Sequence, residues 1–236
     1  MYALDAYRVR SLRMAYASTG GRRTALTLLV LVVVGFLAYS LPPYLTGDSR
    51  VPPTFSLHHP LLVAHVLLAT VAMVAVVAQI CAKRSRLHPW IGRIYVCTAI
   101  PAAVSALVIG ALTPFGPVLA ASNVVLATLW LWFTLNGYRQ ARRRRFGGHR
   151  AAMIYSSALA LSVITNRIWT PLLAITLNPL QQNLFEGDDE AYLYLVAGLG
   201  GWLGWLVPLL TVRCWMHRRR VTVPSSKPHK PETQPV

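Results

Sequence analysis

The most informative polar residue of this sequence is a charged side chain inside an apolar run. Arg167 lies in the stretch "ITNRIWTPLL", residues 164–173, and mostly hydrophobic residues precede and follow it. An arginine at the centre of a membrane span costs about 2.5–3.5 kcal/mol on insertion scales and normally faces other helices, where it finds a partner. Its guanidinium would suit an anionic or carbonyl-bearing ligand. The alternative is that the long side chain extends to the lipid headgroups and binds nothing.

Other polar residues are expected at the depth of Arg167. A helix rises ~1.5 Å per residue, which places Arg167 in the outer third of its span and His65 and Asn123 close to the outer ends of theirs. Asp189 and Glu190 precede the last span on that side and are candidate ion-pair partners for the arginine. The sequence therefore predicts a pocket open to the outer face that binds a small anionic or quinone-like ligand through Arg167, His65, Asn123, Glu190 and Tyr192.

Two histidines form a second candidate site on the opposite side. His88 and His149 each stand at the start of a helix, and a b-type haem in a membrane bundle needs two axial imidazoles from different helices. The alternative is that both bond to loop backbone or to phosphate headgroups beside Arg93 and Arg150. No group of residues has metal-ligand spacing, so no metal site is predicted, and the three cysteines are expected to be inert.

Hydrolytic catalysis finds no support in the sequence. It contains no HExxH motif, no serine in a nucleophile elbow and no pair of acidic residues within a span. Without a carboxylate in the membrane, a proton-coupled carrier of the usual kind is also disfavoured. The sequence thus favours a protein that is not an enzyme, and any enzyme would be a membrane oxidoreductase.

The elements that must position these residues are long apolar segments. The chain has 236 residues, of which 55% are hydrophobic and 13% charged, whereas a soluble domain carries roughly 25% charged residues. Each apolar run reaches the ~20 residues needed to cross a bilayer. The sequence predicts an all-α, polytopic membrane protein whose transmembrane domain, residues 24–216, has six helices: 24–41, 60–81, 92–115, 116–138, 151–177 and 191–216.

The placement of charge sets the expected orientation. The net charge is +16, and 21 of the 23 lysines and arginines fall on one side of the predicted spans, together with both termini. Short basic loops stay in the cytoplasm, so we predict cytoplasmic termini in the inner (plasma) membrane, with no nucleic-acid partner. Residues 1–23 form a basic arm that faces the anionic inner leaflet, and residues 217–236 form a basic tail that is expected to be disordered.

The glycine string "GLGGWLG" of the last span superficially resembles a phosphate-binding loop. No strand precedes it, and Gly200 and Gly204 have the small-xxx-small spacing that lets two helices approach closely. We therefore predict that these glycines serve helix packing.

Several motifs resemble a bacterial family of multi-pass membrane proteins that is known as a domain of unknown function (number 2306). The resemblance covers about residues 54–212 and rests on "LHPWIGRIYV", "HRAAM", "NRIWTPLL" and the preceding histidine-containing span. The chain departs from the family pattern at Pro89, Ala152, Tyr155, Leu209 and Arg213. The family's recurrent positions correspond here to His65, Gln79, His88, Gly92, Arg93, Tyr95, His149, Arg150, Arg167 and Tyr192.

The resemblance implies a membrane topology but no activity. Three functional hypotheses therefore stay open: a ligand-binding protein with or without haem-based redox chemistry, a small-solute transporter of the permease type, and a scaffold or assembly factor for another membrane complex. Protein partners are not predicted.

Overall fold

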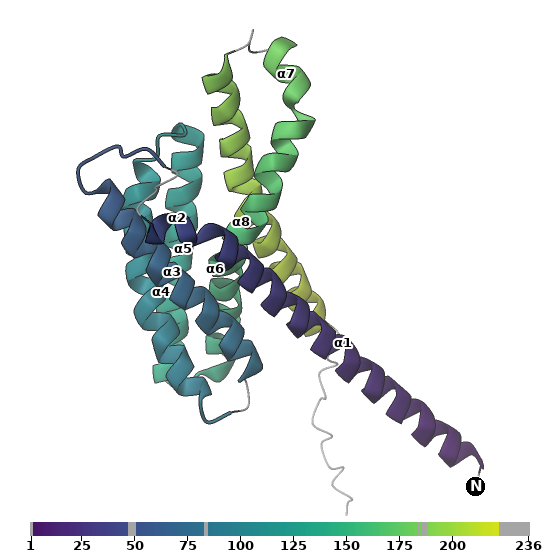
Figure 1. Ribbon diagram of the computed structural model, residues 1–236. Helices are drawn as coiled ribbons and strands as arrows, with labels where there is room; N and C mark the ends of the chain where they lie inside the picture. Colours follow the sequence, from purple (N-terminus) through teal and green to yellow (C-terminus); the bar gives the residue numbers. More distant parts are fainter. Residues whose placement is uncertain (1, 47–50, 83–84, 184, 186–187, 222–236) are drawn as a thin grey trace, which may run out of the picture.

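The computed structural model describes residues 2–46, 51–82, 85–183, 185 and 188–221, and every regular element in them is a helix (Figure 1). The all-α fold predicted from the sequence is thus confirmed for this part of the chain. The helices are α1 (Tyr2–Ser40), α2 (Pro42–Leu45), α3 (His58–Cys81), α4 (His88–Ala111), α5 (Pro117–Arg142), α6 (Phe146–Thr176), α7 (Asn178–Asn183) and α8 (Asp189–Val221).

Within the described residues, six helices are long and apolar enough to cross a membrane. They lie in α1, α3, α4, α5, α6 and α8, which confirms the predicted spans. Several boundaries differ from the prediction. α4 covers His88–Ala111 rather than 92–115, and α1, α5, α6 and α8 continue beyond their apolar runs at one or both ends. The first span is the end of a helix that begins at Tyr2, and α8 continues to Val221, into the segment predicted as a tail. The remainder of that segment, residues 222–236, lies outside the described residues.

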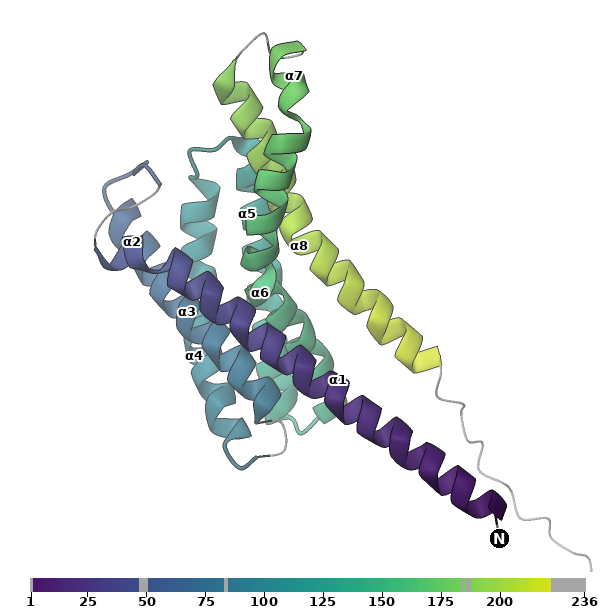
Figure 2. The ribbon, with the colours of Figure 1, turned by 45° about the vertical axis from the view of Figure 1, so that its right-hand side comes forward.

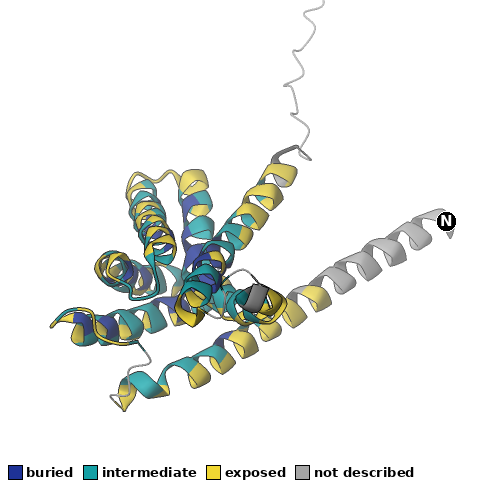
Figure 3. Cartoon of the chain, turned by 90° about the horizontal axis from the view of Figure 1, so that it is seen from above, coloured by how far each residue is buried: buried dark blue, intermediate teal, exposed yellow. Residues whose placement is uncertain are grey.

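Consecutive helices pack side by side and alternate in direction (Figures 1 and 2). α4 packs on α3, α5 on α4 and α6 on α5, while α8 packs against both α6 and α5. α3 and α6 contact each other over few residues, and α1 crosses the bundle obliquely on that side (Figures 2 and 3). We call the end where α3 finishes and α4 begins the basic end. The opposite end, where α4 finishes and α5 begins, is the hairpin end.

Small side chains make the contact between α3 and α4 close. Five alanines are buried in this interface region: Ala72, Ala75, Ala99, Ala102 and Ala103. In a bilayer, where lipid tails are as apolar as the helices, such close contact supplies the van der Waals attraction that holds helices together. Large apolar side chains cover the outside of the bundle instead, as lipid contact requires.

A buried hydrogen-bond network joins α4, α5 and α6 at the centre of the bundle. The indole Nε1 of Trp130 donates to the hydroxyl oxygen of Tyr95 at 3.0 Å, and this hydroxyl is also bonded to Ser156. Thr134 lies 2.7 Å from Ser156, between their hydroxyl oxygens. Polar groups that cannot reach water are thereby satisfied inside the apolar core.

The glycines of α8 bring that helix close to α6. A methyl group built on Gly200 would lie 2.5 Å from Oγ1 of Thr170, and one on Gly204 would lie 2.8 Å from Cβ of Asn166. This confirms the packing role predicted from their spacing.

Pro208 has no N–H to offer the carbonyl of Gly204, four residues earlier. The hydroxyl of Thr165 in α6 donates to that carbonyl instead and replaces the missing backbone hydrogen bond of α8.

Candidate functional site

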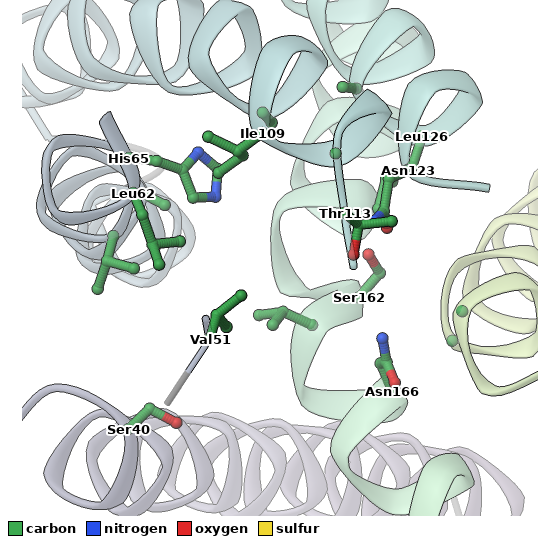
Figure 4. A pocket seen from close by; sticks show the side chains of 18 of the residues that line it. Ser40, Val51, Leu62, His65, Ile109, Thr113, Asn123, Leu126, Ser162 and Asn166 are labelled. Atoms are coloured by element: carbon green, nitrogen blue, oxygen red, sulfur yellow. The ribbon is translucent and has the colours of Figure 1, made fainter. Parts of the chain in front are cut away.

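A cavity of about 370 Å³ lies in the half of the bundle nearer the hairpin end (Figure 4). α3, α4, α5 and α6 surround it, α8 contributes to the lining, and the end of α1 covers the side where α3 and α6 are apart. Cavities that bind small molecules start at roughly 300 Å³, so this one has room for a small ligand or for the head group of a larger one.

His65 forms one wall of the cavity from α3. Its Nδ1 lies 2.8 Å from the carbonyl oxygen of Ala102 in α4. Because a carbonyl only accepts, Nδ1 carries the hydrogen, and Nε2 of the neutral ring is an acceptor. In Figure 4 one ring nitrogen points towards α4 and the other towards the cavity. The cavity therefore holds an imidazole acceptor in a fixed orientation.

Short polar side chains form the opposite wall (Figure 4). Asn123 comes from α5, Ser162 and Asn166 from α6, and Thr113 from the turn after α4. Asn166 accepts a hydrogen bond from Thr170 at 2.7 Å through Oδ1, which leaves its amide N–H groups for other acceptors. The amide of Asn123 bonds to no other described residue. Two carboxamides thus face the cavity with unused hydrogen-bonding capacity.

Close contact between helices fixes both asparagines. A methyl group on Gly110 of α4 would lie 2.7 Å from Cβ of Asn123, just as one on Gly204 would collide with Asn166. Backbone approaches this close fix the positions from which the two asparagine side chains extend into the cavity.

Arg167 lines the cavity from α6, and its side chain is exposed. No salt bridge or hydrogen bond joins it to another residue in the part of the chain that the structure describes. Its carbonyl also lacks the usual helical donor, because residue 171 is a proline. Arg167 is therefore a cation at the rim of the cavity.

The other residues predicted for this pocket lie elsewhere. Glu190 accepts a hydrogen bond from Tyr194, and the Tyr192 hydroxyl donates to the carbonyl of Ala174, which ties the start of α8 to the end of α6. Asp189 is bonded to Gln181. Neither Glu190 nor Tyr192 lines the cavity, and neither acidic residue pairs with Arg167.

The charge of the lining favours ligands without a positive charge. Among the described residues, no aspartate or glutamate lines the cavity, and Arg167 is the only permanently charged lining residue. The buried His58 closes the hairpin end, where its Nδ1 accepts from the backbone N–H of Thr54 at 3.1 Å. A cation would meet no counter-charge from the lining residues that the structure describes.

His88 and His149 stand at the basic end, near the starts of α4 and α6, and neither lines the cavity. Nδ1 of His149 lies 2.9 Å from the carbonyl of Gly137 and therefore donates to it, which leaves Nε2 available. Nδ1 of His88 is buried and bonds to no described residue. Two imidazoles from the starts of α4 and α6 thus lie at the same end of the bundle.

Most of the family-like residues have structural contacts. Gln79 donates to the carbonyl of His88 at 2.7 Å, and a methyl group on Gly92 would lie 2.9 Å from the same amide nitrogen. These three residues join α3 to α4. Tyr95 belongs to the central network and holds Trp130, which lines the cavity.

The two family-like arginines of the basic end, Arg93 and Arg150, are exposed. The guanidinium of Arg93 lies 4.9 Å from the centre of the Trp90 ring, one helical turn away. Neither arginine takes part in the cavity.

Sequence reasoning missed Asn166, Ser162 and His58. Their spacing carried a usable signal: His58 and His65 are two turns apart on α3, and Ser162 and Asn166 are one turn apart on α6. Residues three, four and seven apart share a helix face. Asn166 was not predicted because its neighbour Arg167 carries a charge, which is the stronger signal in a membrane span.

The comparisons with known proteins support the same membrane architecture. Residues 62–212 match the model of a family described as "Predicted membrane protein (DUF2306)". No curated protein and no solved structure matches the chain. The matched region begins within α3 and ends within α8, so it contains α4, α5, α6 and most of α3, whereas α1 precedes it.

Proposed function

We propose a ligand-binding role for this chain, which belongs to the DUF2306 family of predicted membrane proteins. Its ligand is a small quinone-like or anionic molecule with carbonyl or hydroxyl groups, and its site is the cavity between α3 and α6. The observation that carries the proposal is the arrangement of His65 across open space from Asn123, Ser162 and Asn166.

The chemistry of these groups defines the ligand class. The carboxamides of Asn123 and Asn166 can donate to carbonyl oxygens, and Nε2 of His65 can accept from a hydroxyl. A quinone and its quinol offer these complementary groups on one flat, apolar ring. Arg167 at the rim adds attraction for an electron-rich or anionic group.

The orientation follows from the distribution of charge. With the basic end in the cytoplasm, as short arginine-rich loops favour, the cavity lies in the outer half of the plasma membrane. The basic residues then face the anionic inner leaflet, each contributing about 1 kcal/mol where it is near the surface.

Binding in lipid nanodiscs tests the proposal. We would titrate the protein with decylubiquinone, its quinol and benzoate, and compare His65→Asn and Asn123→Leu with the matched control Asn136→Leu. Asn136 also lies in α5 but does not line the cavity. We expect saturable binding of a quinone or of benzoate that weakens in the two cavity variants alone. Binding that is equal in all variants, or absent for all three compounds, would refute the proposal.

Haem-based redox chemistry is the second candidate at the basic end. It is supported by the position of His88 and His149 near the starts of α4 and α6, at the same end of the bundle, and by Nε2 of His149, because the backbone hydrogen bond of this ring uses Nδ1. The absorption spectrum of the purified protein decides it: a Soret band that disappears in the His88→Ala, His149→Ala double variant supports haem, and a colourless protein contradicts it.

Transport and scaffolding make different predictions. If the protein is a transporter of the permease type, proteoliposomes that contain it should accumulate the bound compound, and this uptake should depend on His65. A scaffold would keep its membrane partners after substitution of the cavity residues, and it would bind none of the three compounds.

A further inference from the structure

The cavity has one side at which the bundle itself is not closed. α3 and α6, which form its flanks, contact each other over few residues, whereas every sequential pair of helices around it packs extensively. α1 lies across this gap (Figure 4) and contributes Phe36, Leu37 and Ser40 to the lining. α1 thus lies between the cavity and the surroundings of the bundle on this side, and Tyr44 of the short α2 that follows it also lines the cavity.

α1 is held only loosely to the rest of the molecule. Of the α1 side chains that the structure describes, only Val33 is buried, and Leu31 and Val34 are 61% and 58% exposed. A methyl group on Gly35 would meet nothing within 4 Å. In a bilayer these exposed surfaces are covered by lipid tails, so lipid reaches the edges of α1 beside the gap.

Polar and apolar groups are unevenly distributed around the cavity. His65, Thr113, Asn123 and Ser162 lie towards α4 and α5, away from α1 (Figure 4). Two polar lining residues are exceptions, because Asn166 lies nearer to α1 and Ser40 belongs to it. α1 adds the apolar Phe36 and Leu37, and the flanking helices add the apolar side chains Leu62, Val66 and Val163. Such a gradient suits a molecule with a polar head and an apolar chain.

The volume of the cavity also favours a ligand with a polar head group and an apolar chain. About 370 Å³ accommodates an aromatic head group but not a long hydrocarbon chain as well. A chain attached to a head group near Asn123 must therefore leave the cavity, and the gap under α1 leads to lipid. The hydroxyl oxygen of Ser40, at the end of α1, is buried beside the cavity without a hydrogen-bond partner among the described residues.

We propose that the ligand is a bilayer-soluble amphiphile, a quinone- or phenol-type head group on an apolar chain, which reaches the cavity sideways between α3 and α6 beneath α1. The head group then bonds to His65 and Asn123, and the chain passes Leu37 into the membrane. This inference rests on the proposed binding function and specifies its ligand class and its route.

A pair of matched compounds tests the ligand class. We would measure binding of decylubiquinone and of the same head group without its decyl chain to the full-length protein in phosphatidylcholine–phosphatidylglycerol nanodiscs. We expect the chain-bearing compound to bind at least tenfold more tightly at equal mole fraction in the membrane. Equal binding of both compounds would overturn the amphiphile proposal.

A variant of α1 tests the route. Leu37→Trp fills the gap, while the control Val34→Trp places the same side chain on an exposed position of α1 that does not line the cavity. We expect Leu37→Trp to slow association of decylubiquinone about tenfold and Val34→Trp to leave it unchanged. Equal rates in both variants would overturn lateral access.

Photolabelling distinguishes entry through the gap beneath α1 from entry at the hairpin end. A decylubiquinone analogue with a diazirine at the end of its chain should label α1, α3 and α6 near the gap. Labelling confined to residues 51–57 and 112–116 would show access from the aqueous hairpin end and would overturn the route. Retained His65-dependent binding in that case leaves the proposed function intact, whereas loss of His65 dependence would refute the function itself.

Discussion

Gly204 of α8 and Asn166 of α6 are so close that a methyl group on the glycine would lie 2.8 Å from Cβ of the asparagine. Real Cβ atoms do not approach so closely, and part of the contact is with the backbone of α6, so the helices would have to separate. This contact fixes the position of one carboxamide in the wall of the cavity.

Gly204→Ala should therefore weaken ligand binding as well as stability. We expect overpacking to cost about 1–3 kcal/mol of unfolding free energy and the displaced Asn166 to lower affinity about tenfold, which corresponds to ~1.4 kcal/mol. Thermal unfolding and nanodisc titration measure the two effects. Gly137→Ala is the control for overpacking alone, because its methyl group would meet Met153 of α6, away from the cavity.

Substitutions of His65 should separate its structural hydrogen bond from its binding group. Asparagine can place its amide nitrogen near the position of Nδ1 and keep a bond to the carbonyl of Ala102, but it offers nothing where Nε2 stands. We expect His65→Asn to retain most of the stability and to lose about tenfold in affinity, since one hydrogen bond contributes ~0.5–1.5 kcal/mol. His65→Phe should lose both. Equal destabilisation by the two variants would argue that the histidine serves only the fold.

The hydrogen bond from Thr165 to the carbonyl of Gly204 predicts that the effects of Thr165→Val and Pro208→Ala on the unfolding free energy are not additive. Thr165→Val leaves the buried carbonyl of Gly204 without a donor and should cost about 1–3 kcal/mol. In a Pro208→Ala background, the new backbone N–H can donate to that carbonyl. The cost of Thr165→Val should therefore fall to less than half, as a double-mutant cycle of unfolding free energies would show. Additive costs would contradict this role of Thr165.

Tyr95→Phe should destabilise the protein and free the Trp130 side chain that lines the cavity. The substitution removes the oxygen that accepts the Trp130 N–H and leaves this buried donor unpaired, at a cost of about 1–3 kcal/mol. Stability in the purified protein measures this cost, and Tyr138→Phe, at a position where the side chain is 43% exposed, is the control. Because Trp130 lines the cavity, ligand affinity should fall along with stability.

The orientation of the bundle can be tested with introduced cysteines. In a background with Cys81, Cys97 and Cys214 replaced by serine, we would compare Ser56→Cys, near the hairpin end, with Ser85→Cys, at the basic end. Both serines are exposed. A membrane-impermeant maleimide should label the first variant in intact cells and the second only after permeabilisation. The reverse pattern would contradict cytoplasmic termini.

The level of several polar residues along the helix bundle was predictable from the sequence. His65, Asn123 and Arg167 were expected at one level from their distance to the ends of their spans, and the structure places all three at one cavity. Depth follows from a fixed helical rise, which does not depend on neighbouring helices. The pairing of Arg167 with an acidic residue did not follow, because Glu190 and Asp189 bond within their own end of the structure.

The amino-acid sequence by itself determined the spans, their number and their expected sides, because transfer of a segment into lipid depends on the composition of that segment alone. Which faces meet was decided only by the tertiary structure. One residue along a helix turns its side chain by about 100°, so Asn166 faces the cavity while its neighbour Arg167 stands at the rim. The gap between α3 and α6, and the position of α1 across it, arise from contacts between segments far apart in the chain, and no local pattern of residues encodes them.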